Sequence, residues 1–525
     1  MAENKNYNYN IPKEKFRFVN AGEHLSDKKF DDKPISYFRD ALNRFCKNRA
    51  SVVAAIIITV IILYAFITPW VSTMDSTFMD PYYAKKGPRN IFLRDTIGLA
   101  DGGTTRDYSE KSLIRALAIG IGAENYDGRG VSIEEGWESE YQPVLEVGEI
   151  KTSMNAKKQE VRNFIGGRID VYLEVGFIFK SLTQNEYAKL EAWQEETGLK
   201  VIYPLLNEED TADPKDANLW YKNKKYTPIY TNANGDQRTM ELEAGMVLED
   251  NYKRDAEGNL IYTEATGGGT TETAQRRVRL LYYNYYQYLN GFEPEYILGT
   301  DSQGYDMAQR IAGGIKLSLL VAVCVCLINF VIGALYGAVE GYYGGWIDMI
   351  LERISDILNY VPFIVVATLF QIHLAAKVGA LISLIFAYVL TGWIGTAYRV
   401  RTQFYRFKNQ EYVMAARTLG ARDRRIIWKH IFPNTLGTLI TSSALAIPST
   451  MLSESTLSFL GIVKLGSADS TSIGTLLADS QGIWFTSPHL MIVPAVVISL
   501  LMISFNLFGN GLRDAFNPSL RGVEE

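Results

Sequence analysis

The side chains that could hold a metal or act as nucleophile and base are few and widely separated. The four histidines are His24, His373, His430 and His489. Cys324 and Cys326 stand two residues apart, a spacing that points two thiols to different faces of a helix. The sequence contains no G-x-x-x-x-G-K-[ST] loop for ATP. We therefore expect no catalytic site, no metal site and no cofactor bound by this chain, although catalysis by an isolated Ser or Asp stays open.

One carboxylate follows a long apolar run. Glu454 comes about 20 residues after Pro433, which corresponds to ~30 Å along a helix. Ionisable residues at such depth usually face a cavity or a partner. We expect Glu454 either to line a substrate path, where a peptide's ammonium group could bind, or to hydrogen-bond a neighbouring helix.

A cluster of tyrosines comes shortly before the second apolar run. Its members are Tyr282, Tyr283, Tyr285, Tyr286 and Tyr288. Amphipathic rings favour the headgroup level of a membrane, which predicts a helix lying at the interface. In the alternative, some of the rings, Tyr285 among them, line the mouth of a substrate path together with Asp306.

Six intervals without Asp, Glu, Lys or Arg are long enough to cross a membrane. They are residues 50–74, 317–339, 357–376, 378–398, 430–453 and 480–512. A span needs ~20 apolar residues, whereas buried helices of a soluble protein have shorter runs and amphipathic flanks. The sequence therefore predicts an all-α polytopic bundle of six transmembrane helices in contact with membrane lipid.

Basic residues set the expected orientation. Several Lys and Arg residues precede the first span in segment 1–49, and nine lie between residues 399 and 429. Burying those nine in the bilayer would cost on the order of 20 kcal/mol, and positive residues beside a span stay in the cytoplasm. We expect a multi-pass protein of the cell membrane with cytoplasmic N- and C-termini. Segment 75–297 is then extracellular.

Segment 75–297 is too long for a connection and predicts a separate α+β insert. The run 167–179 is β-branched and aromatic, as is typical of a strand, and 199–206 predicts another. Thr183 and Glu186 form a capping box for a helix that Gly198 ends. The clusters at 232–236 and 255–259 indicate hairpin turns. Nothing in the sequence indicates nucleic-acid binding.

A charged stretch, about 405–433, separates the fourth and fifth apolar runs. Asn409 can cap a short helix from Glu411, and Gly420 supplies the left-handed residue that ends it. Asp423 can then cap a second helix, and Pro433 opens the fifth span. The side chains of Ala415 and Ala416 are small enough for another protein to approach closely, while Tyr412, Val413 and Leu419 offer apolar contacts. We expect this hairpin to be the surface on which a partner protein pushes. The alternative is a loop that only packs on the surface of the protein.

The spacing of this hairpin resembles the EAA loop of ABC importer permeases. Ala415, Ala416, Gly420, Ile431 and Pro433 match that pattern. The family's Glu is replaced by Met414, and Glu411 stands one helical turn earlier. Segments 298–322, 341–365, 453–461 and 505–521 further resemble the second permease of the oligopeptide, dipeptide and nickel importers, whereas the large insert departs from them.

The resemblance implies a non-catalytic translocation subunit in a bacterial cell membrane. Its partners would be a second permease subunit, two cytoplasmic ABC ATPase subunits that bind ATP and Mg, an extracellular substrate-binding lipoprotein and a peptide substrate. The residues expected to contact the ATPases form the coupling set, which comprises Glu411, Tyr412, Met414, Ala415, Ala416, Leu419 and Gly420. The permease core is then 298–525, with residues 50–74 as its first span.

Three other functions remain open from the sequence. A permease for nickel or another small solute fits the family, although histidines are scarce. A membrane-anchored ligand sensor fits the acidic insert but leaves the hairpin spacing unexplained. A membrane hydrolase lacks a histidine-based zinc site.

Overall fold

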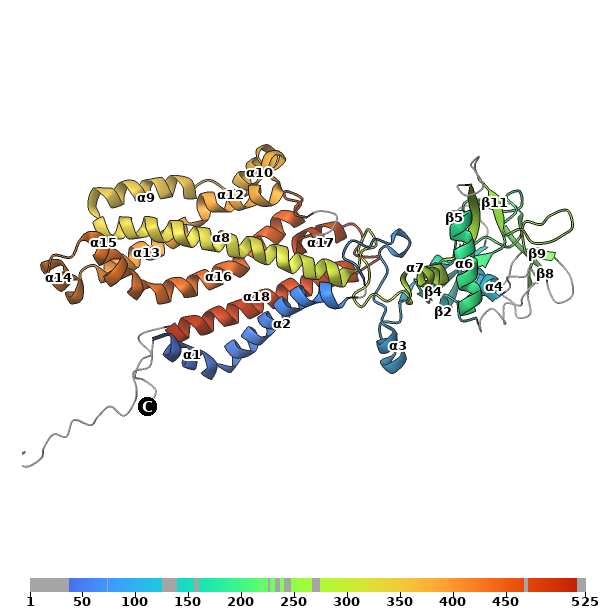
Figure 1. The fold of residues 1–525 in the computed structure, drawn as a ribbon, viewed down its shortest axis with the longest axis horizontal. Helices are drawn as coiled ribbons and strands as arrows, with labels where there is room; N and C mark the ends of the chain where they lie inside the picture. The colour runs from blue at the N-terminus through green and yellow to red at the C-terminus, as the bar shows by residue number, and fades with distance from the viewer. Residues whose placement is uncertain are drawn as a thin grey trace, which may run out of the picture.

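The computed structural model describes residues 37–516, apart from 73, 125–138, 155–159, 225–226, 232–236, 240–246, 267–273 and 467–470. Its helices form a long bundle, and the insert stands at one end of it (Figure 1). The hairpin that contains α14 (Glu411–Thr418) lies at the opposite end, and α1 (Tyr37–Lys47) lies at the end of α2 (Arg49–Val71) remote from the insert. The bundle therefore separates the insert from the hairpin along the long axis.

Five helices of the described chain are long and apolar enough to span a membrane, or up to six if one bent pair counts as a span. The five are α2, α8 (Met307–Tyr343), α12 with α13 (Ala380–Gly392 and Ile394–Phe407), α15 through α16 (Asp423–Phe459) and α18 (His489–Phe516). The expected helical membrane fold with an α+β insert is confirmed.

The bent pair is α9 (Gly345–Asn359) with α10 (Phe363–His373), which meet at 72°. The apolar run 357–376 is not one continuous helix, because the chain breaks at Pro362, which lacks an N–H and disfavours helix in the residue before it. A short helix, α11 (Ala375–Val378), follows. The sixth run also starts later than expected, because Ser480 ends α17 (Ile473–Ser480) and α18 begins after Pro488.

Glycines let α8 and α13 approach closely. Gly333, Gly337 and Gly341 recur every four residues along α8. A Cβ at Gly333 would lie 2.7 Å from the carbonyl oxygen of Trp393, and one at Gly341 would lie 2.6 Å from the Cβ of Phe404. Small residues at this spacing favour tight helix packing in membranes. The seam fixes α13, which leads directly into α14.

The insert contains three antiparallel sheets in its described residues. The first comprises β1 (Gly103–Ser109), β4 (Glu160–Asp170) and β2 (Val144–Glu146) in that order, with β3 (Glu149–Met154) also on β4. The second comprises β11 (Thr263–Ala265), β12 (Gln275–Leu281) and β5 (Phe177–Thr183), with β6 (Ile202–Tyr203) also on β12. The third comprises β10 (Val247–Leu248), β8 (Thr227–Thr231) and β7 (Asn223–Lys224), with β9 (Gln237–Thr239) also on β8. The helices of the insert are α3 (Ile91–Ile97), α4 (Glu110–Glu124), α6 (Gln184–Thr197) and α7 (Tyr282–Asn290).

Several local predictions for the insert are confirmed. Thr183 and Glu186 form the capping box of α6, and Gly198 ends that helix in the left-handed conformation. The turn at 255–259 closes with a hydrogen bond from Asp255 N to Asn259 O of 2.9 Å. The cluster 232–236 lies outside the described residues, and β8 and β9 on either side of it pair antiparallel.

The two strand predictions need correction. The run 167–179 is not one strand, because the carboxylate of Asp170 accepts the backbone N–H groups of Tyr172 and Leu173 and turns the chain between β4 and β5. The run 199–206 contributes only the two residues of β6, since Pro204 has no N–H to donate.

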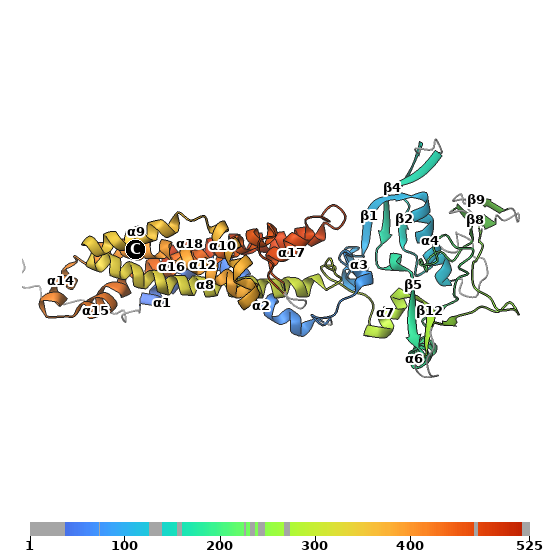
Figure 2. The ribbon, with the colours of Figure 1, turned by 90° about the horizontal axis from the view of Figure 1, so that it is seen from above.

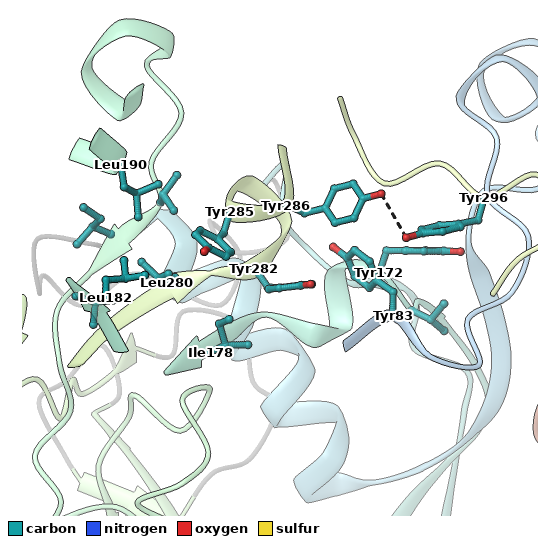
Figure 3. Close-up of a cluster of buried hydrophobic side chains, with 14 of the residues drawn as sticks. Tyr83, Tyr172, Ile178, Leu182, Leu190, Leu280, Tyr282, Tyr285, Tyr286 and Tyr296 are labelled. Atoms are coloured by element: carbon teal, nitrogen blue, oxygen red, sulfur yellow. Dashed lines mark hydrogen bonds between the residues drawn. The ribbon is translucent and has the colours of Figure 1, made fainter. Parts of the chain in front are cut away.

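The predicted interfacial tyrosine helix is wrong. Tyr282, Tyr285 and Tyr286 of α7 are buried in one of the hydrophobic clusters of the insert, which also contains Tyr83, Tyr172 and Tyr296 (Figure 3). Three of the hydroxyls have hydrogen-bond partners within the cluster. The Tyr282 hydroxyl donates to the carboxylate of Asp80 at 2.6 Å, and the hydroxyls of Tyr286 and Tyr296 lie 3.3 Å apart. These partners lower the cost of burying the rings of Tyr282, Tyr286 and Tyr296. Tyr285 lies inside this core rather than along a path through the bundle.

Candidate functional site

The hairpin at the end of the bundle begins where α13 stops. Gln410 is the N-cap of α14 and makes no side-chain capping bond, so the cap predicted at Asn409 is wrong. At the other end, Gly420 adopts φ +79°, and its N–H donates to Arg417 O at 3.0 Å. The backbone turns there as expected, because glycine reaches this conformation without a side-chain clash.

The coupling set lies almost entirely on the outer side of α14. Glu411, Tyr412, Met414, Ala415 and Gly420 are exposed, Ala416 is half-buried, and Leu419 is 88% exposed. The apolar contact expected at Val413 is wrong, because that side chain is fully buried with Ile426 and Ile431. One buried anchor thus holds a short helix whose remaining surface is free in this chain.

Hydrogen bonds tie the hairpin to the long helices. The Tyr342 hydroxyl at the end of α8 donates to Asp423 at 2.6 Å, and Asn434 of α16 donates to the Tyr412 hydroxyl at 3.2 Å. Asp423 is therefore a partner of α8 rather than the cap of a second helix, since α15 (Asp423–Arg425) already includes it. These bonds connect the hairpin directly to α8 and α16.

The second arm of the hairpin is continuous with a transmembrane helix. Residues Ile426–Ile431 form a π-helical turn between α15 and α16 (Phe432–Phe459), and Pro433 lies in the first turn of α16 as expected. Such turns occur frequently at functional sites. Beside it, Arg422, Arg424, Arg425 and Trp428 line an open hollow of about 520 Å³. This basic hollow suits an acidic surface, and the run of arginines is the sequence signal for it.

A cluster of ion pairs, which the sequence did not predict, fixes α9 against α13. Arg401 lies 2.6 Å from Asp348, 2.9 Å from Glu352 and 3.5 Å from Glu340. Tyr405 donates to Asp348 at 2.7 Å. The i, i+4 spacing of Asp348 and Glu352 puts both on one face, but their partner is about fifty residues away in sequence.

Glu454 is fully buried in α16. Its carboxylate accepts hydrogen bonds from Ser318 of α8 at 2.8 Å and from Ser458 at 3.0 Å. This arrangement corresponds to the second alternative given above, a hydrogen bond to a neighbouring span. A ligand would have to separate these groups before it could reach the carboxylate.

Asp306 is the N-cap of α8 and accepts the backbone N–H of Ala308 at 3.0 Å. Nearby, Arg310 forms a buried ion pair with Asp301 at 2.9 Å. The three tentative path residues therefore do not converge: Glu454 joins two spans, Asp306 caps a helix, and Tyr285 lies in the insert.

A helical membrane bundle that ends in an exposed hairpin agrees with the resemblance to a permease, the membrane subunit of a transporter. Residues 329–522 match the family described as binding-protein-dependent transport system inner membrane component. Residues 36–88 match the N-terminal TM domain of oligopeptide transport permease C. The chain belongs to this family of ABC importer permeases, in the group of oligopeptide and dipeptide permeases C.

Relatives agree with this assignment. The dipeptide transport system permease protein DppC of Bacillus subtilis is 40% identical over 229 residues, which cover 42% of this chain and 68% of the relative. The oligopeptide transport system permease protein OppC of Haemophilus influenzae is 41% identical over 44% of this chain and 72% of the relative. Among solved structures, the MetNI methionine ABC transporter matches at 17% identity and a TM-score of 0.35, covering 40% of this chain and 98% of that chain. That last similarity is too low to carry an argument.

The two family matches leave a gap from residue 89 to residue 328. The gap contains the whole body of the insert from α3 to α7. The insert is thus added to a family core, between its first and second long helices.

Proposed function

We propose that this chain is the translocation subunit of an ATP-driven importer of oligopeptides, forming half of the pathway beside a second permease subunit. The names of its relatives, which are dipeptide and oligopeptide permeases, support a peptide substrate. In this proposal, the insert is extracellular, both termini are cytoplasmic, and an extracellular lipoprotein delivers the peptide.

The coupling set carries the proposal. Two cytoplasmic ATPase subunits power the importer, and one of them binds the outer side of α14. The observation that supports this is a helix held by one buried valine, with Met414, Ala415 and Leu419 exposed around it at the bundle end remote from the insert. Apolar side chains exposed on a rigid element are typical of contact sites.

The replacement of the family's glutamate by Met414 changes the chemistry of the proposed contact with the ATPase. Where the family pattern has a carboxylate, this chain offers a flexible apolar side chain, half of it exposed. Methionine adapts to irregular surfaces, so the ATPase groove facing it is expected to be apolar rather than basic. Glu411, at the positive N-terminal end of α14, is the remaining carboxylate of the coupling set.

Crosslinking in the native complex tests the proposal. With Cys46, Cys324 and Cys326 replaced by serine, Ala415→Cys should crosslink to an ATPase subunit, and crosslinking should change when ATP is added. Leu460→Cys, exposed at the other end of α16, is the control and should not crosslink. Crosslinking at both positions, or at neither, would contradict the assignment.

Purification in mild detergent provides a second test, which separates a permease from a sensor. Two ATPases and a second permease should accompany the chain, and the complex should take up labelled oligopeptides in vesicles. A stable homo-oligomer without ATPases would instead indicate a ligand sensor.

A further inference from the structure

The helix α3 exposes apolar side chains at the base of the insert. Phe92 is 72% exposed and Leu99, just after the helix, is 61% exposed. Figures 1 and 2 place α3 between the bundle and the body of the insert along the long axis, and in Figure 1 it projects to the side on which α1 and α2 lie. Neither Phe92 nor Leu99 belongs to any of the buried hydrophobic clusters of the described residues.

The exposure is built into a rigid segment. Asn90 caps α3 by accepting the N–H of Leu93 at 2.9 Å, and its amide donates to Glu295 at 2.6 Å. At the base, Arg89 and Tyr296 exchange backbone hydrogen bonds of 2.8 and 2.9 Å, and Gly98 ends the helix in the left-handed conformation. Because both ends of α3 are fixed, Phe92 stays exposed unless something outside this chain covers it.

The depth of α3 follows from the lengths of the neighbouring helices. The 23 residues of α2 extend ~34 Å, about the ~30 Å thickness of the hydrocarbon. Gln309 donates to Met74 O at 3.1 Å, which sets the first turn of α8 level with the end of α2. Met307 N bonds Gly299 O, and Tyr296 is three residues earlier, at most ~10 Å of chain. The base of α3 therefore lies at headgroup depth.

Other exposed apolar residues lie at the same level. Trp70 at the end of α2 is 90% exposed and Phe485, before α18, is 82% exposed. The loop of Phe485 is fixed to this level by His489, whose ring nitrogen lies 3.2 Å from Thr300 O. We call Trp70, Phe92, Leu99, Ile297 and Phe485 the junction belt. The belt continues the exposed apolar side of α2, which includes Val60 and Phe66.

We infer that α3 is a membrane foot, which seats the insert on the phospholipid leaflet at its end of the bundle. Aromatic side chains favour the membrane interface, and short apolar helix faces bind there by burying area among headgroups and upper acyl chains. Continuity with the apolar side of a transmembrane helix identifies lipid as the occupant. The foot limits tilting of the insert relative to the membrane plane.

Spin labels in the complete transporter test the foot. Phe92→Cys is labelled in the chain whose three native cysteines are replaced by serine, and the same complex without an added cysteine gives the background. The complex is reconstituted in phosphatidylcholine vesicles. Collision rates are then measured with oxygen, which concentrates in lipid, and with a nickel chelate, which stays in water.

Two positions in the same chain provide references. Met154 on β3 is 71% exposed, which matches Phe92, and lies in the body of the insert; Phe66 of α2 represents the membrane interior. The label at Phe92 should shift from the water-exposed pattern of Met154 toward the lipid pattern of Phe66, with more oxygen and fewer nickel collisions. A label at Leu99→Cys should show the same shift. This second position checks that the shift is not caused by the Phe92 substitution itself.

Two outcomes would overturn the inference. A label at Phe92 that behaves like the one at Met154 would show that α3 stands in water. A label shielded from both reagents would show that protein, such as the second permease subunit, covers α3.

Discussion

Replacing Gly420 by alanine should weaken coupling without disturbing the bundle. Gly420 has φ +79°, and a Cβ built on it meets nothing within 4 Å. The cost of the substitution is therefore backbone strain alone, roughly 1–2 kcal/mol for an L-residue in the left-handed conformation. The strain is relieved if α14 rotates away from its present angle to α15.

The strain translates into an expected loss of function. At about 1.4 kcal/mol per tenfold change, it reduces the population of correctly placed α14 roughly five- to thirtyfold if binding to the ATPase needs that geometry. The assay is the ratio of peptide uptake to ATP hydrolysis in proteoliposomes, which should fall for Gly420→Ala. Gly420→Asn should fall less, because asparagine tolerates the left-handed conformation.

A matched control lies at the other end of α16. Gly461 has φ +73° and likewise has nothing within 4 Å of an added Cβ, so Gly461→Ala adds a similar strain far from the hairpin. Its uptake-to-hydrolysis ratio should stay near that of the unmodified complex. Equal ratios for all three variants, or an equal loss at Gly461, would refute the argument that the angle at Gly420 governs coupling.

Four further substitutions probe the hairpin, the buried carboxylate of α16 and the insert. Ala415→Trp should abolish uptake while membrane insertion stays unchanged, because the bulk meets the partner rather than the bundle; Leu460→Trp should transport normally. Glu454→Ala should lower the unfolding midpoint of the complex, because buried serine hydroxyls without an acceptor cost about 1–3 kcal/mol, whereas Glu454→Gln should lower it less. Thr183→Ala should reduce hydrogen-exchange protection of α6 by about 1 kcal/mol, the usual value of a lost cap. The pKa of Glu186 is lowered because the backbone N–H and hydroxyl of Thr183 donate to it, so its contribution is present above the unfolded pKa and disappears as pH falls through the folded one. Glu186→Gln should therefore reduce protection at pH 7 but not in acid, and equal loss at both pH values would contradict this.

Some local signals in the sequence predicted local structure, although the caps expected at Asn409 and Asp423 were wrong. Gly420 and Gly198 end helices in the left-handed conformation, and Thr183 with Glu186 forms a capping box, because each depends only on residues within one or two helical turns. The apolar runs predicted the long helices for the same reason. The break at Pro362 had a signal too, since a proline interrupts the third run, but run length alone does not show whether a helix bends.

Contacts between distant segments could not be predicted in this way. The tyrosines of α7 appeared suited to a membrane interface until Tyr83, Tyr172 and Tyr296, far away in sequence, supplied the rest of a core. Arg401 and its carboxylates likewise needed α9 to fold back on α13. Composition describes a side chain's preference, and only the tertiary fold decides which surface satisfies it.

The helix α8 joins the two ends of the molecule. Its 37 residues extend ~55 Å, from the hydrogen bond between Gln309 and Met74 at the insert end to the one between Tyr342 and Asp423 at the hairpin. Gly333, Gly337 and Gly341 pack the half of α8 nearer the hairpin closely against α13. A tilt of about 5° therefore displaces one end relative to the other by about 5 Å over this length. The insert is attached at the start of α8 and the hairpin near its end. In the proposed mechanism, a push on the hairpin therefore tilts α8, and the base of the insert has to move with it or oppose the tilt.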